Sequence, residues 1–308
     1  MQQTWIQNIR KKLLFIYNPY SGMKLITKKL AEIVDLFTKG GYDVICHPTQ
    51  SKGDCMEFIK ERHAEFDLIV VSGGDGTLNE AVNGMMNGGC KNEFGYIPTG
   101  STNDFSHSMG IPSQAVKAAS AIMSGKAFEC DIGRLNDRYF TYVAAFGTLA
   151  QVSYSTPQNV KNVLGFAAYI LEGIAALSTI ESFNLSFTSE EHSGSGEYIL
   201  GLVTNSLYVG GFSSILSDSV VLNDGLFEVL LVKKPKNAAQ LQAIASSVLK
   251  REFDQRYIDC FKTKKITIAS DKPLSWTLDG ENGGAHSVSV IENFEKALKI
   301  IKPDVSEN

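Results

Sequence analysis

Hydrophobic residues in the first 130 positions gather in short runs that are followed by polar residues, glycine or proline. Each run has the length of a buried β-strand, and segments with a helical spacing of hydrophobic residues separate the runs. The pattern predicts strands at 13–17, 42–47, 67–71 and 94–97, and helices at 24–39, 54–63 and 78–86. Because strands alternate with helices, we predict a parallel, doubly wound α/β sheet, in which ligands bind beyond the carboxyl ends of the strands.

The pattern changes after about residue 130, where hairpin-type links replace the helices. Strands are predicted at 139–146, 183–188, 198–205, 227–232 and 265–268, helices at 160–177 and 237–253, and a hairpin loop at Gly194-Ser195-Gly196. This half is therefore predicted to be mostly antiparallel β structure. The stretch 294–302 is expected to return to the first domain.

Composition and charge exclude several classes of protein. The 308 residues contain 29 Lys and Arg against 33 Asp and Glu, a net charge of −4, which disfavours a strongly basic nucleic-acid binder. Five scattered cysteines without a CxxC pair indicate reduced thiols in a cytosolic protein. No apolar run is long enough to span a bilayer, because Glu172 interrupts the most apolar stretch, 163–180. We expect a protein without a membrane span that can still touch a membrane surface.

The segment SGGDGTLNE at 72–80 is the clearest candidate for chemistry. Its glycines allow the backbone to approach a phosphate closely, and the N-terminus of the helix that follows attracts anions. Asp75 could hold Mg²⁺ directly or through water. A tight turn with an acidic cap is the alternative, but three glycines directly after a buried strand favour phosphate binding.

Two more polar loops follow predicted strands, NPYSG at 18–22 and PTGSTNDF at 98–105. Their side chains suit phosphate or ribose binding, and they suit turns and helix caps equally well. Asp104 could support a metal ion or an acceptor alcohol. As neighbours of the glycine loop at one sheet edge, the two loops become credible parts of a single site.

Three further acidic residues stand in short turns of the β-rich half. Asp131 precedes Ile-Gly, Asp224 lies in an Asp-Gly pair flanked by backbone carbonyls, and Glu281 follows another Asp-Gly pair. Each has a plain alternative as a turn residue, because Asp-Gly is typical of tight hairpins. As functional residues, Asp131 would be a carboxylate that faces the cleft, Asp224 a ligand of a hard cation and Glu281 a general base.

Together these motifs resemble the diacylglycerol kinase catalytic family, which includes soluble bacterial diacylglycerol kinases and the sphingosine and ceramide kinases. The matching segments, in the family's order, are NPYSG at 18–22, GGDGT at 73–77, GSTNDF at 100–105, DIG at 131–133, DGLF at 224–227 and LDGE at 278–281. NAD kinases share the glycine loop alone. The first and last motifs make the resemblance to lipid kinases more specific.

The resemblance implies a two-domain fold of the NAD kinase/diacylglycerol kinase type. An α/β ATP-binding domain is expected at 10–130 with 292–308, and a β-sandwich lipid-binding domain at 131–291. It also implies a cytoplasmic protein that associates peripherally with the inner face of the membrane and has a lipid partner, and it allows a homodimer. From the charge we expect no nucleic-acid partner.

The resemblance also implies roles for individual residues. The expected ATP contacts are Asn18, Ser21, Gly22, Thr49, Gly73, Gly74, Asp75, Gly76, Thr77, Leu78, Asn79, Glu80 and Ser101. A structural Mg²⁺ is expected on Val221, Asp224 and Leu226. Glu281 is expected to be the general base, with Asp104 or Asp131 as the next candidate. From the chemistry of the residues, we also expect Asp75 and Asp131 to support the nucleotide's Mg²⁺. Ser101 replaces a threonine of the family, and Ser106-His107 stands where an arginine often follows.

We therefore interpret the chain as an ATP- and Mg²⁺-dependent lipid kinase that phosphorylates the hydroxyl of diacylglycerol to give phosphatidic acid. The alternatives are a kinase of another acceptor, such as phosphatidylglycerol, a sphingoid base or NAD, and a non-catalytic lipid or nucleotide sensor.

Overall fold

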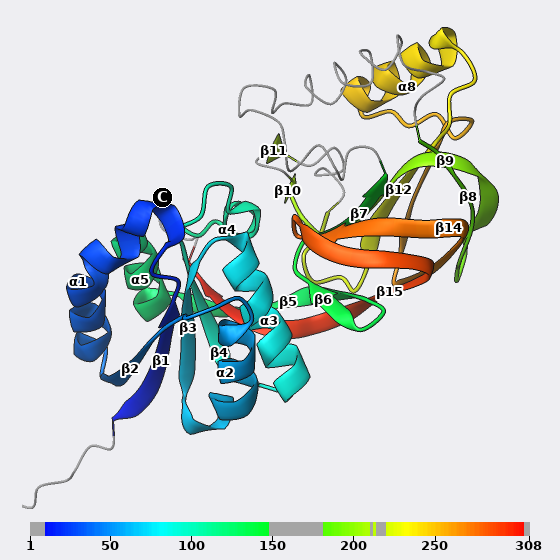
Figure 1. The fold of residues 1–308 in the computed structure, drawn as a ribbon. Helices are drawn as coiled ribbons and strands as arrows, with labels where there is room; N and C mark the ends of the chain where they lie inside the picture. The colour runs from blue at the N-terminus through cyan, green and yellow to red at the C-terminus, as the bar shows by residue number, and fades with distance from the viewer. Residues whose placement is uncertain (1–9, 148–180, 210–211, 214–219, 305–308) are drawn as a thin grey trace, which may run out of the picture. The chain divides into compact units, whose positions relative to one another are not determined.

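The computed structural model describes residues 10–147, 181–209, 212–213 and 220–304 (Figure 1). The chain divides into two compact units, each described by itself. The first unit comprises Met1–Ser101, Gly110–Phe128 and Lys299–Asn308, and the second comprises Thr102–Met109 and Glu129–Leu298. The helix predicted at 160–177 lies outside the described residues.

A parallel sheet forms the centre of the first unit, as the alternating pattern predicts. Its strands are β1 (Lys11–Tyr17), β2 (Tyr42–Pro48), β3 (Leu68–Gly73) and β4 (Glu93–Pro98), in the order β2-β1-β3-β4. The carboxyl end of β15 (Glu281–Lys302) joins β4 in parallel, with Ile300 opposite Phe94. The chain therefore returns to the first unit at its C-terminal end, as expected for 294–302.

Helices cover both faces of this sheet. They are α1 (Leu25–Lys39), α2 (Asp54–Arg62), α3 (Asp75–Gly88) and α5 (Ala115–Ser124), with short 3₁₀ turns at Ser21–Lys24 and His63–Glu65. In Figure 1, α1 and α5 lie on one face, and α2 and α3 lie together on the other. The sheet buries residues such as Leu13, Val70 and Phe94 completely, which explains the continuous hydrophobic runs of its strands.

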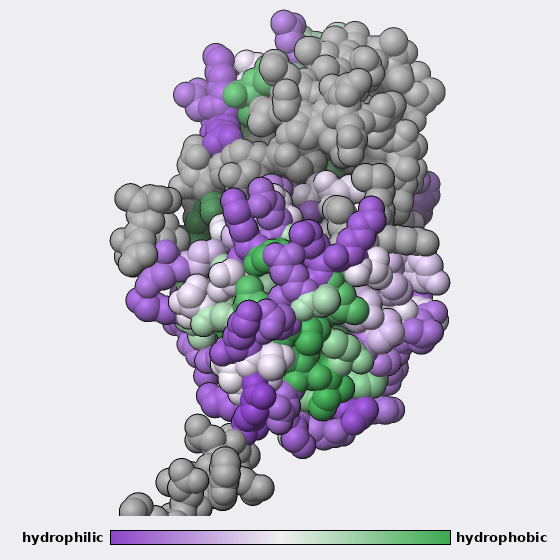
Figure 2. All heavy atoms as spheres, turned by 90° about the vertical axis from the view of Figure 1, so that its left-hand side faces the viewer, coloured by the Kyte–Doolittle hydropathy of each residue, from purple (hydrophilic) through white to green (hydrophobic). Residues whose placement is uncertain are grey.

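Hydrophilic residues cover much of the face of this unit that Figure 2 shows, with a hydrophobic area among them. The side chain of Ile45 on β2 is 39% exposed. Because β2 is the end strand of the sheet order, its outer edge has no neighbouring strand among the described residues.

The second unit is built on antiparallel strands in the order β13-β12-β9-β7-β14-β15. They are β7 (Val143–Gly147), β9 (Ser193–Thr204), β12 (Phe227–Lys233), β13 (Ile258–Thr263) and β14 (Lys265–Leu278), together with β15. The strand β8 (Phe183–Ser189) pairs with β9 and β14, β5 (Lys126–Leu135) pairs with β15 and with β6 (Arg138–Phe140), and β10 (Tyr208–Val209) pairs with β11 (Phe212–Ser213). Among the described residues, the helices of this unit are α4 (Asp104–Met109) and α8 (Ala238–Lys250).

Two hydrophobic clusters stabilise this unit. Aromatic rings dominate the larger one, where Phe146 and Trp276 meet edge to face with centroids 5.0 Å apart. The smaller one joins α8, through Leu241 and Ile244, to Leu230 of β12. The mixed architecture, α/β followed by antiparallel β, confirms the predicted fold class.

The prediction of a hairpin loop at Gly194-Ser195-Gly196 is wrong. These residues belong to β9 and pair with β8, with Gly194 opposite Phe187 and Gly196 opposite Leu185. A Cβ atom at Gly194 would lie 2.7 Å from the Phe187 ring, so the missing side chain makes room for an aromatic neighbour. Glycine in a strand can serve such close packing as well as a turn.

Other predicted boundaries of strands and helices differ from the observed ones by more than the fraying of element ends explains. The strand predicted at 139–146 is divided between β6 and β7, and the one predicted at 265–268 continues to Leu278. Helix α3 starts at Asp75 and not at 78, so the glycine loop runs directly into the helix.

Candidate active site

Three polar loops meet at the carboxyl edge of the first unit's sheet. The chain leaving β1 is tied to β3 by a bond from Asn18 N to Ser72 O (2.9 Å), and Thr99 N after β4 donates to Gly73 O (2.8 Å). Ser21 Oγ donates to Thr99 O (3.1 Å) and accepts from Thr99 Oγ1 (3.0 Å). The loops at 18–22, 72–77 and 98–101 therefore form one connected surface, as expected from parallel strands.

Glycines allow these loops to approach one another. Gly22 has φ +53°, and a Cβ atom there would lie 2.1 Å from Thr99 O. A Cβ atom at Gly74 would lie 3.3 Å from Gly100 Cα. Side chains at these positions would push the loops apart, so the compact edge requires glycine at 22 and favours it at 74.

Helix α3 points its N-terminus at this edge. Gly74 is the N-cap residue and makes no side-chain capping bond, and Asp75 is the first helical residue. The first N–H groups of a helix, together with its dipole, form a binding site for anions such as phosphate. The glycine loop thus has the geometry expected for a phosphate-binding turn.

Tyr96 is a buried residue at this edge that the sequence analysis did not single out. Its hydroxyl donates to Gly73 O (3.0 Å), and it is fully buried. Burial, and then the negative charge of Asp75, raise the pKa of Tyr96 well above its ordinary value, so the hydroxyl stays protonated as a donor. In the sequence, Tyr96 lies in a predicted strand with Phe94 and Pro98 two positions away on either side. This pattern is typical of a residue in the hydrophobic core.

Three of the expected ATP contacts on α3 have side chains that are buried or bonded within the protein. Leu78 is completely buried, so its side chain belongs to the core. The side chain of Asn79 is also buried, and Asn83 Nδ2 donates to the backbone carbonyl oxygen of Asn79 (2.8 Å). Glu80 Oε1 accepts a bond from Gly53 N (2.8 Å), which links α3 to the turn before α2. Thr49 N in that turn donates to Tyr17 O (2.9 Å), so Thr49 lies beside the end of β1.

In the second unit, Asp279 and Gly280 form the two-residue turn between β14 and β15. Both have positive φ, +51° and +80°, as a type I′ hairpin requires. The Asp279 carboxylate is buried and accepts bonds from Thr141 N (2.7 Å), Thr141 Oγ1 (2.9 Å), Tyr142 N (2.9 Å) and Val143 N (3.2 Å). The Asp279 carboxylate therefore anchors the turn to the backbone at 141–143, where β6 ends and β7 begins. This contact also holds the backbone before Glu281.

Glu281 starts β15 opposite Leu278 and is half-buried. Because the turn before it is anchored, its backbone has little freedom. Rigid support of this kind is what a positioned base needs.

The Asp131 carboxylate is buried against two backbone groups. Its Oδ2 accepts from Gly225 N (2.7 Å) and its Oδ1 accepts from Lys296 N (2.8 Å). Burial is the largest influence and raises the pKa of Asp131, while the two N–H bonds lower it. Its partners tie the loop at 221–226 to β15, a role that the sequence analysis did not foresee.

The loop expected to hold a structural cation carries suitable oxygen donors. Asp224 Oδ1 accepts from Leu226 N (3.1 Å), and the backbone carbonyls of Val221 and Leu226 flank this carboxylate in the chain. Carboxylate and carbonyl oxygens are the ligands that Mg²⁺ takes. Among the described residues no group of three His, Cys, Asp or Glu side chains could hold a metal, but the expected site needs only one carboxylate.

An ion pair between a partly exposed lysine and a buried glutamate lies beside this loop. Lys262 Nζ is 3.0 Å from Glu228 Oε1 and 3.5 Å from Asp224 Oδ2. Burial raises the pKa of Glu228 to about 7. The oxygen donors of the loop fit a cation in kind, whereas the Lys262 ammonium group repels a second positive charge at Asp224.

Asp104 begins α4 in the second unit and is buried. Ser106 Oγ donates to Asn103 O (2.8 Å), and Ser108 Oγ lies 2.8 Å from Ser206 Oγ. Ser101 is exposed and is the last residue of the segment Met1–Ser101 of the first unit.

The structure thus combines an α/β unit, in which a glycine loop leads into a helix N-terminus, with an antiparallel β unit, in which Glu281 follows an anchored turn. A model of the diacylglycerol kinase catalytic domain matches residues 12–135, and a model of the YegS C-terminal NAD kinase beta sandwich-like domain matches residues 143–302.

Relatives extend over nearly the whole chain. A diacylglycerol kinase of Bacillus subtilis (strain 168) is 36% identical over 296 residues, which are 95% of this chain and 97% of the relative. One from Staphylococcus aureus (strain Newman) is 34% identical over 301 residues, 96% of this chain and 94% of the relative. A crystal structure of a diacylglycerol kinase from Bacillus anthracis (strain Sterne) has a TM-score of 0.74 at 25% identity and covers 96% of this chain and 98% of its own.

The chain belongs to the diacylglycerol kinase family and is a lipid kinase. The family assigns ATP as the phosphoryl donor. Among the described residues, no helix has the length and apolar character needed to cross a membrane.

Proposed function

We propose that the protein transfers the γ-phosphoryl group of ATP to the free hydroxyl of diacylglycerol, forming phosphatidic acid and ADP. The observation that carries the proposal is the connected edge of three polar loops around the N-terminus of α3. The names of the relatives, diacylglycerol kinases of B. subtilis and S. aureus, support the acceptor.

The phosphate groups of ATP are assigned to the glycine loop at 73–77 and the loops at 18–22 and 98–101. Backbone N–H groups there would stabilise negative charge on the phosphate oxygens, and phosphoryl transfer depends mainly on such positioning and charge stabilisation. Mg²⁺, when bound with the nucleotide, would neutralise charge on the transferred group, and Asp75 is the carboxylate that we assign to it.

Glu281 is assigned the role of general base. Its carboxylate accepts the proton of the lipid hydroxyl while the hydroxyl oxygen forms a bond to the γ-phosphorus. The bond from this phosphorus to the β,γ-bridging oxygen breaks, and ADP leaves. A primary alcohol is a weak nucleophile at neutral pH, so a base within hydrogen-bond reach is needed. The contacts of Asp131 and Asp279 support positioning roles for both.

The acceptor is found by a direct assay. Purified protein is given γ-labelled ATP and, in parallel, mixed micelles of diacylglycerol, phosphatidylglycerol or sphingosine, or free NAD. We expect labelled phosphatidic acid and at least ten-fold slower labelling of the other acceptors. Faster labelling of another acceptor would contradict the proposed substrate, and the absence of any ATP turnover would indicate a sensor.

The Asp75→Ala variant, and Asp35→Ala as a matched control, show whether the label depends on the glycine loop. Asp35 pairs with Lys39 on the exposed face of α1, away from the loops. Mass spectrometry of a total membrane lipid extract after incubation with ATP would identify any natural acceptor missing from the panel.

A further inference from the structure

The turn between β2 and α2 lies at the same sheet edge as the phosphate-binding loops. It contains Thr49, expected to contact ATP, and continues to Gly53. Tyr17 and Pro48 are opposite each other in neighbouring parallel strands, and Thr49 N extends this pairing by its bond to Tyr17 O. Two local bonds are found here, from Asp54 N to Ser51 O (3.3 Å) and from Gln50 Nε2 to Pro48 O (2.7 Å), and Gly53 has φ +87°. The shape of the turn also depends on groups outside it.

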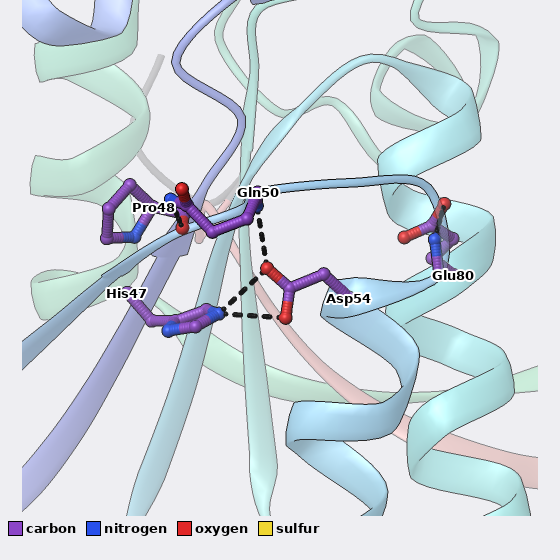
Figure 3. Close-up of polar contacts among 6 residues, drawn as sticks. His47, Pro48, Gln50, Asp54 and Glu80 are labelled. Carbon is purple, nitrogen blue, oxygen red and sulfur yellow. Dashed lines mark hydrogen bonds and ion pairs between the residues drawn. The ribbon is translucent and has the colours of Figure 1, made fainter.

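A carboxylate from α2 holds the first half of the turn. Asp54 Oδ2 accepts from Gln50 N (2.7 Å), and the Asp54 oxygens lie 3.1 and 3.2 Å from His47 Nε2 (Figure 3). The His47 ring in turn stacks on Phe58, with ring centroids 3.9 Å apart. The side chains of His47 and Asp54 are 22% and 21% exposed, so the pair is neither core nor free surface.

A carboxylate from a different helix holds the second half. Glu80 Oε1 accepts from Gly53 N (2.8 Å), and Glu80 stands on α3, the helix that begins at the glycine loop (Figure 3). Since Asp75 of the glycine loop and Glu80 belong to one helix, this bond ties the position of the turn to that of the loop.

We propose that Asp54 and Glu80 are positioning residues that together hold the turn at 50–53, and with it Thr49, in the shape that binds ATP. This inference rests on the proposed function. The backbone N–H groups of Gln50 and Gly53 are held by carboxylates from two helices, and ordering the turn upon binding without these bonds would cost conformational entropy. Two carboxylates that fix both of its ends remove this cost before ATP arrives.

The inference gives Glu80 a role distinct from a direct nucleotide contact. Its carboxylate acts through one oxygen on a backbone N–H, so the amide oxygen of glutamine can replace it. A contact that used the negative charge, for example through Mg²⁺, would not survive the same change.

The test measures KM for ATP and kcat at saturating diacylglycerol, together with direct binding of ATP by calorimetry. The variants are Asp54→Ala, Glu80→Ala, Glu80→Gln and the double alanine variant, with Asp35→Ala as the control. We expect each single alanine variant to raise KM and Kd for ATP about ten-fold, with kcat within two-fold of wild type. Glu80→Gln should restore KM to within about three-fold of wild type.

The double variant should raise KM by clearly less than the product of the single effects, because both carboxylates hold the same turn. Unchanged KM in both alanine variants would overturn the proposal, and so would a loss of kcat alone. If Glu80→Gln is as impaired as Glu80→Ala, Glu80 acts through its charge and the positioning role is wrong. A wild-type protein that neither binds ATP nor phosphorylates lipid would contradict the proposed function instead.

Discussion

Two acidic residues, Asp279 and Glu281, lie close together in the chain at the hairpin turn between β14 and β15, and we expect them to have different roles. Two isosteric substitutions distinguish these roles. Asp279→Asn leaves the turn conformation intact, because Asn-Gly is a preferred sequence for a type I′ hairpin and asparagine tolerates positive φ. Any effect of this change therefore comes from the buried carboxylate. Glu281→Gln keeps the size of the side chain and removes its ability to take a proton.

The cost of Asp279→Asn follows from the bonds that the carboxylate accepts. One oxygen serves Tyr142 N and Val143 N, and the other serves Thr141 N and Thr141 Oγ1. Asparagine can offer its oxygen to the first pair and its NH₂ group to the Thr141 hydroxyl, which leaves Thr141 N without an acceptor. A buried N–H without a partner costs about 1–3 kcal/mol, and the loss of charge at two remaining bonds costs about 1 kcal/mol each. The free energy of unfolding should fall by about 3–5 kcal/mol.

Glu281→Gln should have the opposite profile. The residue is half-buried at the start of a strand, so the free energy of unfolding should change by about 0.5 kcal/mol or less. The rate of phosphoryl transfer in a single turnover should fall by about 10²–10⁴-fold, the usual contribution of a positioned base. Binding of ATP should be nearly unchanged, because the glycine loop belongs to the other unit.

Urea unfolding followed by circular dichroism measures the first effect, and rapid-quench labelling measures the second. Asp137→Asn is the matched control, since Asp137 is exposed in the β5–β6 turn of the same unit and should change neither quantity. An Asp279→Asn variant with the wild-type unfolding midpoint would refute the anchoring role. A Glu281→Gln variant within a few-fold of the wild-type rate would remove Glu281 from the mechanism and make Asp104 the next candidate.

Four further predictions concern single positions. Asp75→Asn should lower lipid phosphorylation at least about 100-fold without changing the melting temperature, because the carboxylate is assigned to Mg²⁺ and not to the core; wild-type turnover would exclude this role. Asp224→Ala should lower the melting temperature and abolish any stabilisation by Mg²⁺, which a melt with and without the ion measures; equal Mg²⁺ stabilisation of variant and wild type would show that the loop is only a turn. Gly22→Ala should weaken ATP binding at least about ten-fold in calorimetry, because its Cβ would clash with the Thr99 carbonyl and φ is positive, whereas unchanged affinity would mean that the loops need not touch. Burial raises the pKa of Cys260 to about 11, so at pH 8 only about 0.1% of this thiol is ionised and iodoacetamide should label it far more slowly in the native than in the urea-unfolded protein, as peptide mass spectrometry would show; equal rates would contradict its burial.

Local patterns were sufficient for much of the first unit. The runs that became β1, β3 and β4 are hydrophobic throughout because both faces of a parallel sheet are buried, and this pattern is visible without any contact information. The meeting of the three loops follows from the same topology, since parallel strands that end in polar residues bring those residues to one edge. Here a regular fold converts sequence order into spatial order.

The second unit was harder to predict, because one local pattern has several tertiary solutions. Glycines at 194 and 196 resembled a hairpin loop, and only the Phe187 ring packed across the strand shows why they lie inside β9. The backbone at 141–142 looked like part of a continuous strand, and the Asp279 carboxylate that binds it lies 138 positions further along the chain.

The motif LDGE illustrates the division between sequence and tertiary structure. The tight turn of Asp279 and Gly280, with Glu281 after it, can be read from the residues alone, because positive φ angles limit the residues that can stand there. The burial of Asp279 against distant N–H groups, the bond of Asp131 to Gly225 and the bond of Glu80 to Gly53 become visible only in the folded chain. Hydrogen bonds of buried carboxylates depend on which backbone groups the fold leaves without a partner nearby. That choice is made only when segments far apart in the chain come together.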